Sequence, residues 1–308
     1  MRISVPEAIH ADAMKLLRSR HEVRDWNDPD VMDLSWCEGL IVRTKTVDRG
    51  MMRGSALKVI GSHGAGVDNI DLEAAKELGI MVVNVPEGTA NAVAELAFAL
   101  MLAVSRQLVP GMDDIRAGRA VRTAPAQRGL ELSGKTLGIV GFGRIGRRVA
   151  EIGRLGFGMV VHAHSRSLPV LAQQHVTVHA TLDGLMKAAD CIVVCTPLTP
   201  ETRGLIGRRE ISLCRPSAML VNVGRGGVVD ETALAEALNE GRLYGAALDV
   251  FEQEPPRADN PLLACPRFVA SQHIGINTDE CLRRIGLGVA EDVLAVLDGL
   301  DPLHPCIR

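Results

Sequence analysis

The chain has 308 residues, a length that suggests about two domains at roughly 150 residues each. Its 34 Lys and Arg residues and 37 Asp and Glu residues give a net charge of −3, without a run of like charge long enough to act as a nucleic-acid tail. Five Phe, two Trp and one Tyr are too few for base-stacking platforms, so no nucleic-acid partner is expected. The longest apolar run, residues 93–104, is interrupted by Glu95 and is shorter than the ~20 residues that span a bilayer, so no membrane partner is expected.

Cysteine usage and the N-terminus favour a cytoplasmic protein. Residues 1–10 lack a basic segment followed by an apolar segment and a small-residue cleavage site, so a secretory signal is not predicted. The seven cysteines show no framework spacing, and the cytoplasm would keep them reduced. Cys191 and Cys195 share one face of an apolar strand. We interpret them as packing residues, with a metal-binding pair as the less favoured alternative, and predict no metal site.

Short apolar runs alternate with amphipathic stretches along the whole chain, which is typical of βαβ units and predicts the α/β class with parallel sheets. The first third predicts a small doubly wound unit. Its expected strands are residues 3–5, 39–42, 58–62 and 80–84, and its expected helices are residues 6–20 and 72–78.

A second, larger α/β unit is expected beyond two helical stretches, residues 89–106 and 109–118, and a polar connector, residues 119–131. Its expected strands are residues 136–140, 159–164, 191–196, 219–223, 245–250 and 268–270. A last amphipathic helix is predicted over residues 279–300. The pattern alone leaves open whether this helix packs on the second unit or returns to the first.

A glycine-rich turn indicates a dinucleotide cofactor. The strand at residues 137–140 runs into Gly141-Phe142-Gly143-Arg144-Ile145-Gly146, and a helix follows at once. In this setting Gly141 makes the tight turn, Gly143 lets the backbone approach a pyrophosphate, and Gly146 allows close packing of helix on strand. The free N–H groups at the helix N-terminus then bind phosphate. A purely structural turn is the alternative.

The end of the next strand distinguishes between the two nicotinamide cofactors. An acidic residue normally binds the ribose hydroxyls there, but this strand ends in Ser165-Arg166-Ser167. A carboxylate would repel a 2′-phosphate, whereas a hydroxyl beside a guanidinium would bind one. We therefore favour NADP over NAD. The alternative is a solvated surface arginine.

Three later strands end in residues suited to hydride-transfer chemistry, namely Arg225, Glu254 and His273. Ligands bind at the carboxyl ends of strands in open α/β sheets, so these side chains are expected to converge. His273 would act as acid and base, and Glu254 would fix its tautomer and stabilise its protonated form. Arg225 would hold a substrate carboxylate and polarise the neighbouring carbonyl. Taken singly, a turn arginine, a solvated glutamate and a structural histidine are the simpler interpretations.

Taken together, these segments resemble the D-isomer-specific 2-hydroxyacid dehydrogenases, a family that includes phosphoglycerate dehydrogenases and hydroxypyruvate/glyoxylate reductases. The matching stretches cover nearly the whole chain. They are residues 64–71 (GAGVDNID), 93–95 (VAE), 134–146 (GKTLGIVGFGRIG), 197–202 (PLTPET), 222–230 (NVGRGGVVD), 249–255 (DVFEQEP) and 273–275 (HIG).

The resemblance implies roles for individual residues. Arg225 would bind substrate, Glu254 rather than Glu252 would orient the imidazole, and His273 would be the acid and base. The backbone amides of Ala65 and Gly66 would hold the substrate carboxylate, with Arg43 and Asn69 as weaker candidates. Further cofactor contacts are implied for Arg144, Ile145, Cys195, Thr196, Pro197, Thr202, Val223, Asp249 and Gly275, with Cys195 and Pro197 on the adenine side and Asp249 at the nicotinamide amide.

The resemblance also implies an architecture and an activity. A Rossmann coenzyme domain, residues 98–275, would be inserted into a flavodoxin-like substrate domain made of residues 1–97 and 276–308, and two copies would form a homodimer through the coenzyme domains. Gln272 stands where the family usually has Pro, so a less rigid loop is expected. With the last residue at 308, no C-terminal regulatory domain is expected.

The expected reaction is reduction of a small 2-keto acid to the D-2-hydroxy acid, or its reverse, with hydroxypyruvate or glyoxylate as the first substrates and NADPH as the reductant. The alternatives are oxidation of 3-phosphoglycerate or another 2-hydroxy acid with NAD, and a cofactor-sensing corepressor.

Overall fold

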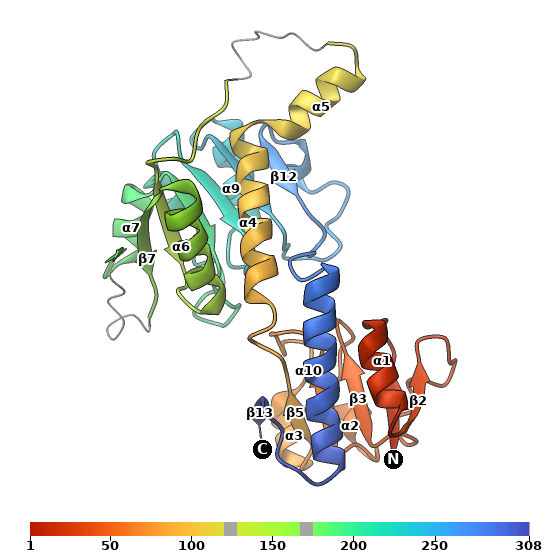
Figure 1. Cartoon of the computed structure of the whole chain (residues 1–308). Coiled ribbons are helices and arrows are strands. Elements are labelled where there is room, and N and C mark those ends of the chain that lie inside the picture. The colour runs from red at the N-terminus through yellow and green to blue at the C-terminus, as the bar shows by residue number, and fades with distance from the viewer. Residues whose placement is uncertain (120–127, 167–174, 308) are drawn as a thin grey trace. The chain divides into compact units, whose positions relative to one another are not determined.

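The chain folds into two compact units (Figure 1). The structure, a computed structural model, describes residues 1–119, 128–166 and 175–307. Unit 1 comprises Met1–Ala92 and Ile276–Arg308, and unit 2 comprises Val93–Gly275. The chain therefore leaves unit 1 inside helix α4 (Ala90–Ser105), slightly before the boundary expected at residue 97.

Unit 1 is built on a six-stranded sheet in the order β13-β5-β4-β3-β1-β2. All neighbours are parallel except β13, which runs antiparallel to β5. The strands are β1 Arg2–Val5, β2 Glu22–Asp25, β3 Gly39–Val42, β4 Val59–Ser62, β5 Met81–Val83 and β13 Pro305–Ile307. This is the flavodoxin-like order with one added antiparallel edge strand, so the expected fold of this unit is confirmed.

The last helix, α10 (Asp279–Leu297), packs on the sheet of unit 1, which answers the question that the sequence pattern left open. Its Val289 and Val293 lie so close to β4 that a Cβ atom on Gly61 would fall 2.5 Å and 2.9 Å from their methyl groups. Glycine is therefore required at this position. The other helices of unit 1 are α1 Ala11–Arg18, α2 Arg49–Met52 and α3 Leu72–Glu77.

Unit 2 has a seven-stranded, fully parallel sheet in the order β12-β11-β10-β9-β6-β7-β8. The strands are β6 Thr136–Val140, β7 Val160–His164, β8 Val176–Val178, β9 Cys191–Val194, β10 Met219–Asn222, β11 Gly245–Leu248 and β12 Phe268–Ala270. This is the Rossmann order, and the strand order reverses between β6 and β9. The carboxyl ends of these two strands are where such sheets bind dinucleotides.

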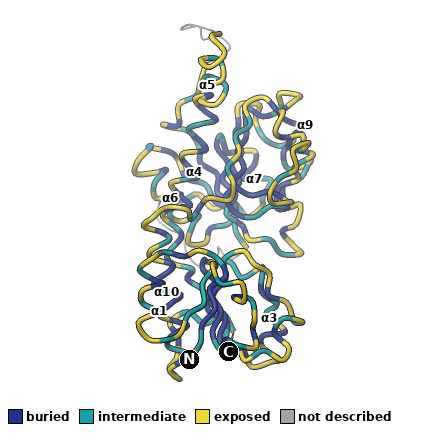
Figure 2. The backbone as a smooth tube through the Cα atoms, turned by 90° about the vertical axis from the view of Figure 1, so that its right-hand side faces the viewer, coloured by how far each residue is buried: buried dark blue, intermediate teal, exposed yellow. Residues whose placement is uncertain are grey.

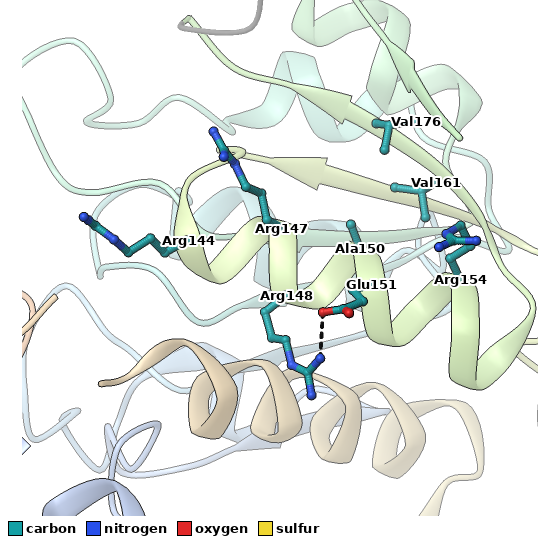
Figure 3. A pocket seen from close by; sticks show the side chains of 8 residues that line it. All are labelled: Arg144, Arg147, Arg148, Ala150, Glu151, Arg154, Val161 and Val176. Carbon is teal, nitrogen blue, oxygen red and sulfur yellow. Dashed lines mark hydrogen bonds and ion pairs between the residues drawn. The ribbon is translucent and has the colours of Figure 1, made fainter. Parts of the chain in front are cut away.

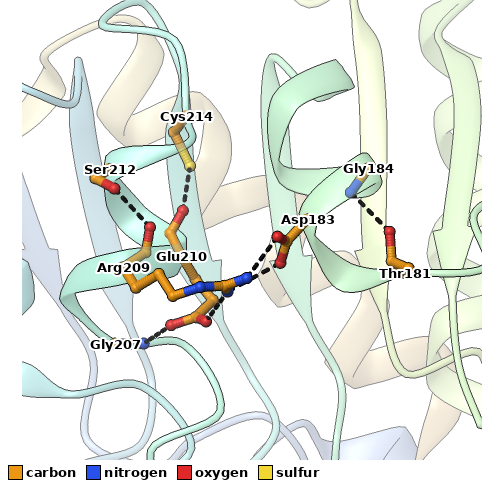
Figure 4. A network of polar contacts seen from close by, with 8 residues as sticks. All are labelled: Thr181, Asp183, Gly184, Gly207, Arg209, Glu210, Ser212 and Cys214. Atoms are coloured by element: carbon orange, nitrogen blue, oxygen red, sulfur yellow. Dashed lines mark hydrogen bonds and ion pairs between the residues drawn. The ribbon is translucent and has the colours of Figure 1, made fainter.

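Beyond α4, the helices of unit 2 are α5 Leu108–Arg116, α6 Arg144–Phe157, α7 Leu182–Ala188, α8 Arg208–Ser212 and α9 Glu231–Asn239, with a short 3₁₀ turn at Pro261–Ala264. Helices α6, α7, α8 and α9 pack on the two faces of this sheet, whereas α5 projects away from it (Figure 1). The Arg209 guanidinium links α8 to α7 by donating two hydrogen bonds to the Asp183 carboxylate, at 3.0 Å and 2.5 Å. It also donates to the Glu210 carboxylate at 2.6 Å (Figure 4).

The core of each unit lies in its sheet, and the tube through the backbone is dark along the central strands and light in the loops (Figure 2). The strands missed from sequence, β2, β8 and β13, are short and lie at the sheet edges. Strand β2 reads Glu-Val-Arg-Asp and β13 has three residues. Edge strands face solvent on one side, so they carry little apolar patterning.

The connector expected at residues 119–131 falls largely on residues 120–127, which lie outside the described residues. Among the helices described, none alone is long and apolar enough to cross a membrane. Helices α4 and α5 reach the necessary length and hydropathy only as a pair, across a bend of 58°.

Candidate active site

The glycine turn after β6 is shaped by close backbone contacts. Gly141 has φ of +91°, and a Cβ atom there would lie 2.7 Å from the Thr196 hydroxyl oxygen. A Cβ atom on Gly146 would lie 2.3 Å from the carbonyl oxygen of Gly141. Both positions therefore exclude any larger residue. The turn directly links the end of β6 at Val140 to the start of helix α6 at Arg144, a tight connection that is typical of dinucleotide sites.

Gly143 differs from its two neighbours because nothing lies within 4 Å of the place where its Cβ atom would be. It precedes the first residue of α6, Arg144, and it has no side chain to cap the helix. An open, exposed backbone at the N-terminus of a 14-residue helix fits a pyrophosphate that must approach the chain closely. The residues present thus fit a dinucleotide cofactor.

Arginines line the exposed side of α6 (Figure 3). Arg144 and Arg147 extend from the first turn of the helix, while Arg154 lies near its other end beside Val161 and Val176. Together with Arg148, whose guanidinium is 2.7 Å from the Glu151 carboxylate, they border a hollow of about 440 Å³. This excess of positive charge raises the local potential and attracts anions to this helix.

At the end of β7, Ser165 and Arg166 follow the strand as expected, and Ser167 lies outside the described residues. The sequence did not suggest Glu201 here, yet its carboxylate oxygen is 3.9 Å from the Arg166 guanidinium. The same oxygen accepts a 2.7 Å hydrogen bond from the Thr199 hydroxyl. Any phosphate at Arg166 would therefore meet a guanidinium already paired with an exposed carboxylate.

The loop after β9 is tied to the glycine turn. The backbone N–H of Cys195 and the hydroxyl of Thr196 both donate to the carbonyl oxygen of Val140, at 2.8 Å and 3.0 Å. The Thr202 hydroxyl donates to the Pro197 carbonyl at 2.7 Å, which closes the loop on itself. On the next strand, the Val223 N–H donates to the Val194 carbonyl at 3.1 Å. These predicted cofactor residues thus border the switch point of the sheet.

Cys191 and Cys195 fit the packing interpretation. Burial raises the pKa of both thiols to about 12, so neither is poised to bind a metal as a thiolate. Across residues 1–119, 128–166 and 175–307, no group of three or more His, Cys, Asp or Glu side chains is placed to hold a metal ion.

The structure places Glu254 against His273. The His273 Nδ1 atom is 2.7 Å from one carboxylate oxygen of Glu254, and the other oxygen accepts the Phe251 N–H at 3.0 Å. Partial burial raises the pKa of Glu254, but these hydrogen bonds and the charges of His273 and Arg225 together hold it below its usual value. Glu254 is therefore ionised at neutral pH, and the Nε2 atom of His273 is left for a substrate.

The backbone at His273 is unusual for a side chain of its size, with φ of +53°. Asp249, which is 2% exposed, holds this loop. Its carboxylate accepts bonds from the Ser271 hydroxyl and from the N–H groups of Ile274 and Gly275, at 2.6 Å, 2.9 Å and 3.0 Å, and its own carbonyl accepts the His273 N–H at 2.8 Å. These bonds order the loop although Gln272 stands in place of proline. The nicotinamide contact of Asp249 stays a prediction.

Arg225 follows β10 in a turn built on close contacts. A Cβ atom on Gly226 would lie 1.8 Å from the Phe251 carbonyl oxygen, and one on Gly224 would lie 2.6 Å from that of Thr196. The Asn222 side chain closes the turn by donating to the Arg225 carbonyl at 3.0 Å. Gly226 thus allows the arginine loop to lie against the segment that leads to Glu254, and Gly224 allows it to lie against the loop after β9.

Sequence reasoning missed the residue that anchors this segment. Glu231, the first residue of α9, accepts the Glu252 N–H at 2.6 Å and the Asn260 side-chain amide at 2.7 Å. Glu252 itself points away to an exposed contact, 3.8 Å from Arg203. A helix-start glutamate usually stabilises its own helix, so the sequence held no signal for this role.

In unit 1, residues 64–66 form the turn after β4. Arg43 and Asn69, the weaker substrate candidates, use their donors within the unit. The Arg43 guanidinium donates to the Ala8 carbonyl at 3.0 Å, and the Asn69 amide donates to the Lys45 carbonyl at 2.7 Å. Ala65 is exposed and Gly66 half-buried.

His63 precedes this turn and should make unit 1 sensitive to acid. It is 2% exposed, and neither ring nitrogen has a hydrogen-bond partner among the described residues. Burial, aided by the charge of Arg43, lowers its pKa from 6.5 to about 4. Between these two values only the unfolded chain binds the proton, so stability falls as the pH falls through this window, by about 3 kcal/mol in all.

Urea unfolding at about pH 7 and about pH 5 checks this expectation, with a loss of about 2 kcal/mol for the wild type and a smaller loss for His63→Leu. Equal losses in the two proteins would show that His63 is not the responsible group.

Comparison with known proteins agrees with this geometry. Residues 98–275 match the family described as D-isomer specific 2-hydroxyacid dehydrogenase, NAD binding domain. The chain is 41% identical to a D-3-phosphoglycerate dehydrogenase of Methanocaldococcus jannaschii, over 97% of this chain but only 58% of that protein. It is 38% identical to a hydroxypyruvate reductase of Thermotoga maritima, over 96% of this chain and 98% of that protein.

Solved structures give the same result. The fold matches the TT0316 protein of Thermus thermophilus with a TM-score of 0.92 and 38% identity, covering 100% of both chains. It matches an NADPH-dependent glyoxylate/hydroxypyruvate reductase of Sinorhizobium meliloti, solved with NADP and malonate, with a TM-score of 0.86 and 31% identity, covering 99% of this chain and 96% of that one. The chain therefore belongs to the D-isomer specific 2-hydroxyacid dehydrogenase family.

Proposed function

We propose that the protein is an NAD(P)-dependent oxidoreductase that reduces a small 2-keto acid to the D-2-hydroxy acid, or runs the reverse reaction, with hydroxypyruvate and glyoxylate as the first substrates to test. The observation that carries the proposal is the 2.7 Å contact between His273 and Glu254 in the unit that also holds Arg225 and the dinucleotide turn. Malonate, a small dicarboxylate, was bound with NADP in the related structure.

Each of the three side chains has a definite task in this reaction. A bound nicotinamide supplies or accepts the hydride. His273, held through Nδ1 by Glu254, gives a proton from Nε2 to the carbonyl oxygen during reduction and removes it during oxidation. Ionised Glu254 stabilises the imidazolium form and fixes the ring orientation. The Arg225 guanidinium pairs with the substrate carboxylate and stabilises charge that develops on the carbonyl oxygen.

A panel of 2-keto acids with NADPH and NADH, followed by absorbance at the nicotinamide band, tests the activity. The same assay in the oxidative direction includes D-3-phosphoglycerate, because the 41% identical relative from M. jannaschii is a phosphoglycerate dehydrogenase. We expect faster turnover of hydroxypyruvate or glyoxylate. Turnover of 3-phosphoglycerate with NAD alone would favour the alternative substrate, and absence of all turnover would favour a cofactor-sensing corepressor.

We infer that NADP is preferred over NAD. Support comes from Ser165 and Arg166 at the end of β7, where a carboxylate would be needed to favour NAD. Arg166→Ala should lower kcat/KM for NADPH about tenfold to hundredfold while changing that for NADH little, because one charge-assisted contact to the 2′-phosphate is lost. Glu201→Gln is the matched variant, since it frees the same guanidinium from its 3.9 Å partner and should raise the NADPH preference. An NADH preference in the wild type would contradict the inference.

We further propose a homodimer that uses helix α5. No residue of this helix is buried, and it exposes an apolar face made of Leu108, Val109, Met112 and Ile115. Ile115→Glu should convert the dimer into monomers in sedimentation velocity, because a charge would enter the apolar contact. Leu155→Glu on α6, where Leu155 is as exposed (65%) as Ile115 (64%), is the control and should stay dimeric. A monomeric wild type would reject this proposal.

A cytoplasmic location, and the expectation that neither nucleic acid nor membrane is a partner, stay predictions.

A further inference from the structure

The turn after β4 in unit 1 has all three of its carbonyl groups bonded. The Gly64 carbonyl accepts the Val85 N–H at 2.8 Å, the Ala65 carbonyl accepts the Asn84 side-chain amide at 2.6 Å, and the Gly66 carbonyl accepts the Ser62 hydroxyl at 2.7 Å. Each carbonyl is thus fixed by a different donor. Two of the donors are side chains, Ser62 at the end of β4 and Asn84 directly after the neighbouring strand β5.

Fixing a carbonyl also fixes the amide that follows it. A trans peptide is planar and its C=O and N–H point in opposite directions, so the three bonds set the directions of the N–H groups of Ala65, Gly66 and Val67. Within the part of the chain that the structure describes, none of these three N–H groups donates a hydrogen bond. Ala65 is exposed and the other two residues are half-buried, so the turn is not enclosed in the core.

We propose that Ser62 and Asn84 are positioning residues that aim these amides at the carboxylate of the 2-keto acid. The inference rests on the proposed function, which makes that carboxylate the ligand of Ala65 and Gly66. The inference extends the proposed function in two ways. It adds the Val67 amide as a donor, and it names the side chains that set the directions of the three N–H groups. A turn with Gly64 and Gly66 has wide backbone freedom, so without these bonds the donors would reorient and bind the anion less tightly.

The two side chains are themselves well anchored. Ser62 is 2% exposed at the end of β4, which lies between β3 and β5 in the sheet. The Asn84 N–H is 3.3 Å from the His304 carbonyl oxygen, and the His304 imidazole is 2.8 Å from the carboxylate of Asp292, which is 2% exposed in α10. The C-terminal segment therefore anchors Asn84, whose side chain donates to the Ala65 carbonyl.

Kinetics of Ser62→Ala and Asn84→Ala test the proposal. Each should raise KM for the 2-keto acid about tenfold and leave kcat within about threefold, because the lost interaction acts on binding in ground and transition state alike. Ser62→Thr keeps the hydroxyl and should restore the wild-type KM. Ser55→Ala, which removes a 2.8 Å hydroxyl-to-carbonyl bond elsewhere in unit 1, should leave KM unchanged.

Calorimetric titration of the cofactor-loaded protein with oxalate gives a second readout that needs no turnover. Oxalate affinity should fall about tenfold in Ser62→Ala and Asn84→Ala and should be unchanged in Ser55→Ala. NADPH affinity should be unchanged in all of them, because the dinucleotide turn lies in unit 2.

The outcomes separate this inference from the proposed function. A wild type that reduces no 2-keto acid would overturn the function, while its oxalate titrations would still decide on Ser62 and Asn84. Wild-type KM and oxalate affinity in both alanine variants would overturn the positioning role, as would failure of the wild type to bind oxalate. If one variant does not fold, the other and Ser62→Cys, which keeps the size but weakens the donor, remain to decide it.

Discussion

His273→Ala should lower kcat for 2-keto acid reduction by about 10² to 10⁴, because the variant has no group at this position to deliver the proton. The dinucleotide turn and Arg225 are untouched, so the affinity for NADPH should change by less than about threefold. Stopped-flow or steady-state absorbance measures the first quantity and fluorescence titration the second. Near-normal turnover would show that another group carries the proton.

The neighbouring glutamates provide an internal control for the same site. Glu254→Gln keeps the size of the side chain but removes the charge that stabilises the imidazolium, so kcat for reduction should fall strongly. The alkaline limb of the pH–rate profile for reduction should move to lower pH, because the imidazolium loses its proton more readily. Glu252→Gln alters an exposed group 3.8 Å from Arg203 and should be mild. The opposite order of effects would mean that the register of this segment has been misassigned.

The second large effect is expected at Gly143. Nothing lies within 4 Å of a Cβ atom at this position, so Gly143→Ala should fold normally. A methyl group would nevertheless occupy the space through which a pyrophosphate reaches the helix N-terminus. Loss of one or two charge-assisted hydrogen bonds should weaken cofactor binding about tenfold to several hundredfold.

Gly156→Ala is the matched control for this experiment. It lies in the same helix, α6, and a Cβ atom there would make only a 4.0 Å contact with Ile152. Its cofactor affinity should equal that of the wild type, and it should be slightly more stable since alanine favours helix. Wild-type affinity in Gly143→Ala would show that no phosphate group passes this residue.

Local patterns were sufficient to predict most of the fold. The strands at residues 39–42, 136–140 and 268–270 have the predicted bounds, and the first two are almost wholly buried apolar runs. Strand β2 escaped prediction because its single apolar residue, Val23, gives no alternation to detect. The place of α10 could not be derived from its own pattern, since any amphipathic helix fits either sheet.

The candidate site shows a similar division. The glycine turn and the positions of Arg225, Glu254 and His273 after their strands were readable, since parallel strands end at one edge. Contacts between distant segments were not. Two contacts, between Glu201 and Arg166 and between Glu231 and the Glu252 N–H, form because loops that are distant in sequence lie close together. Neither residue type nor spacing predicts such contacts.

The discontinuity of unit 1 has a consequence for synthesis. Strands β1 to β5 leave the ribosome before the residues of unit 2, but the helix that buries one side of their sheet, with Ile285, Val289 and Val293, is translated after all of them. The nascent N-terminal segment must keep this apolar surface uncovered while the inserted unit, which is continuous in sequence, can already complete its own sheet. Chaperone dependence and aggregation during expression should therefore originate in the first 92 residues rather than in the inserted unit.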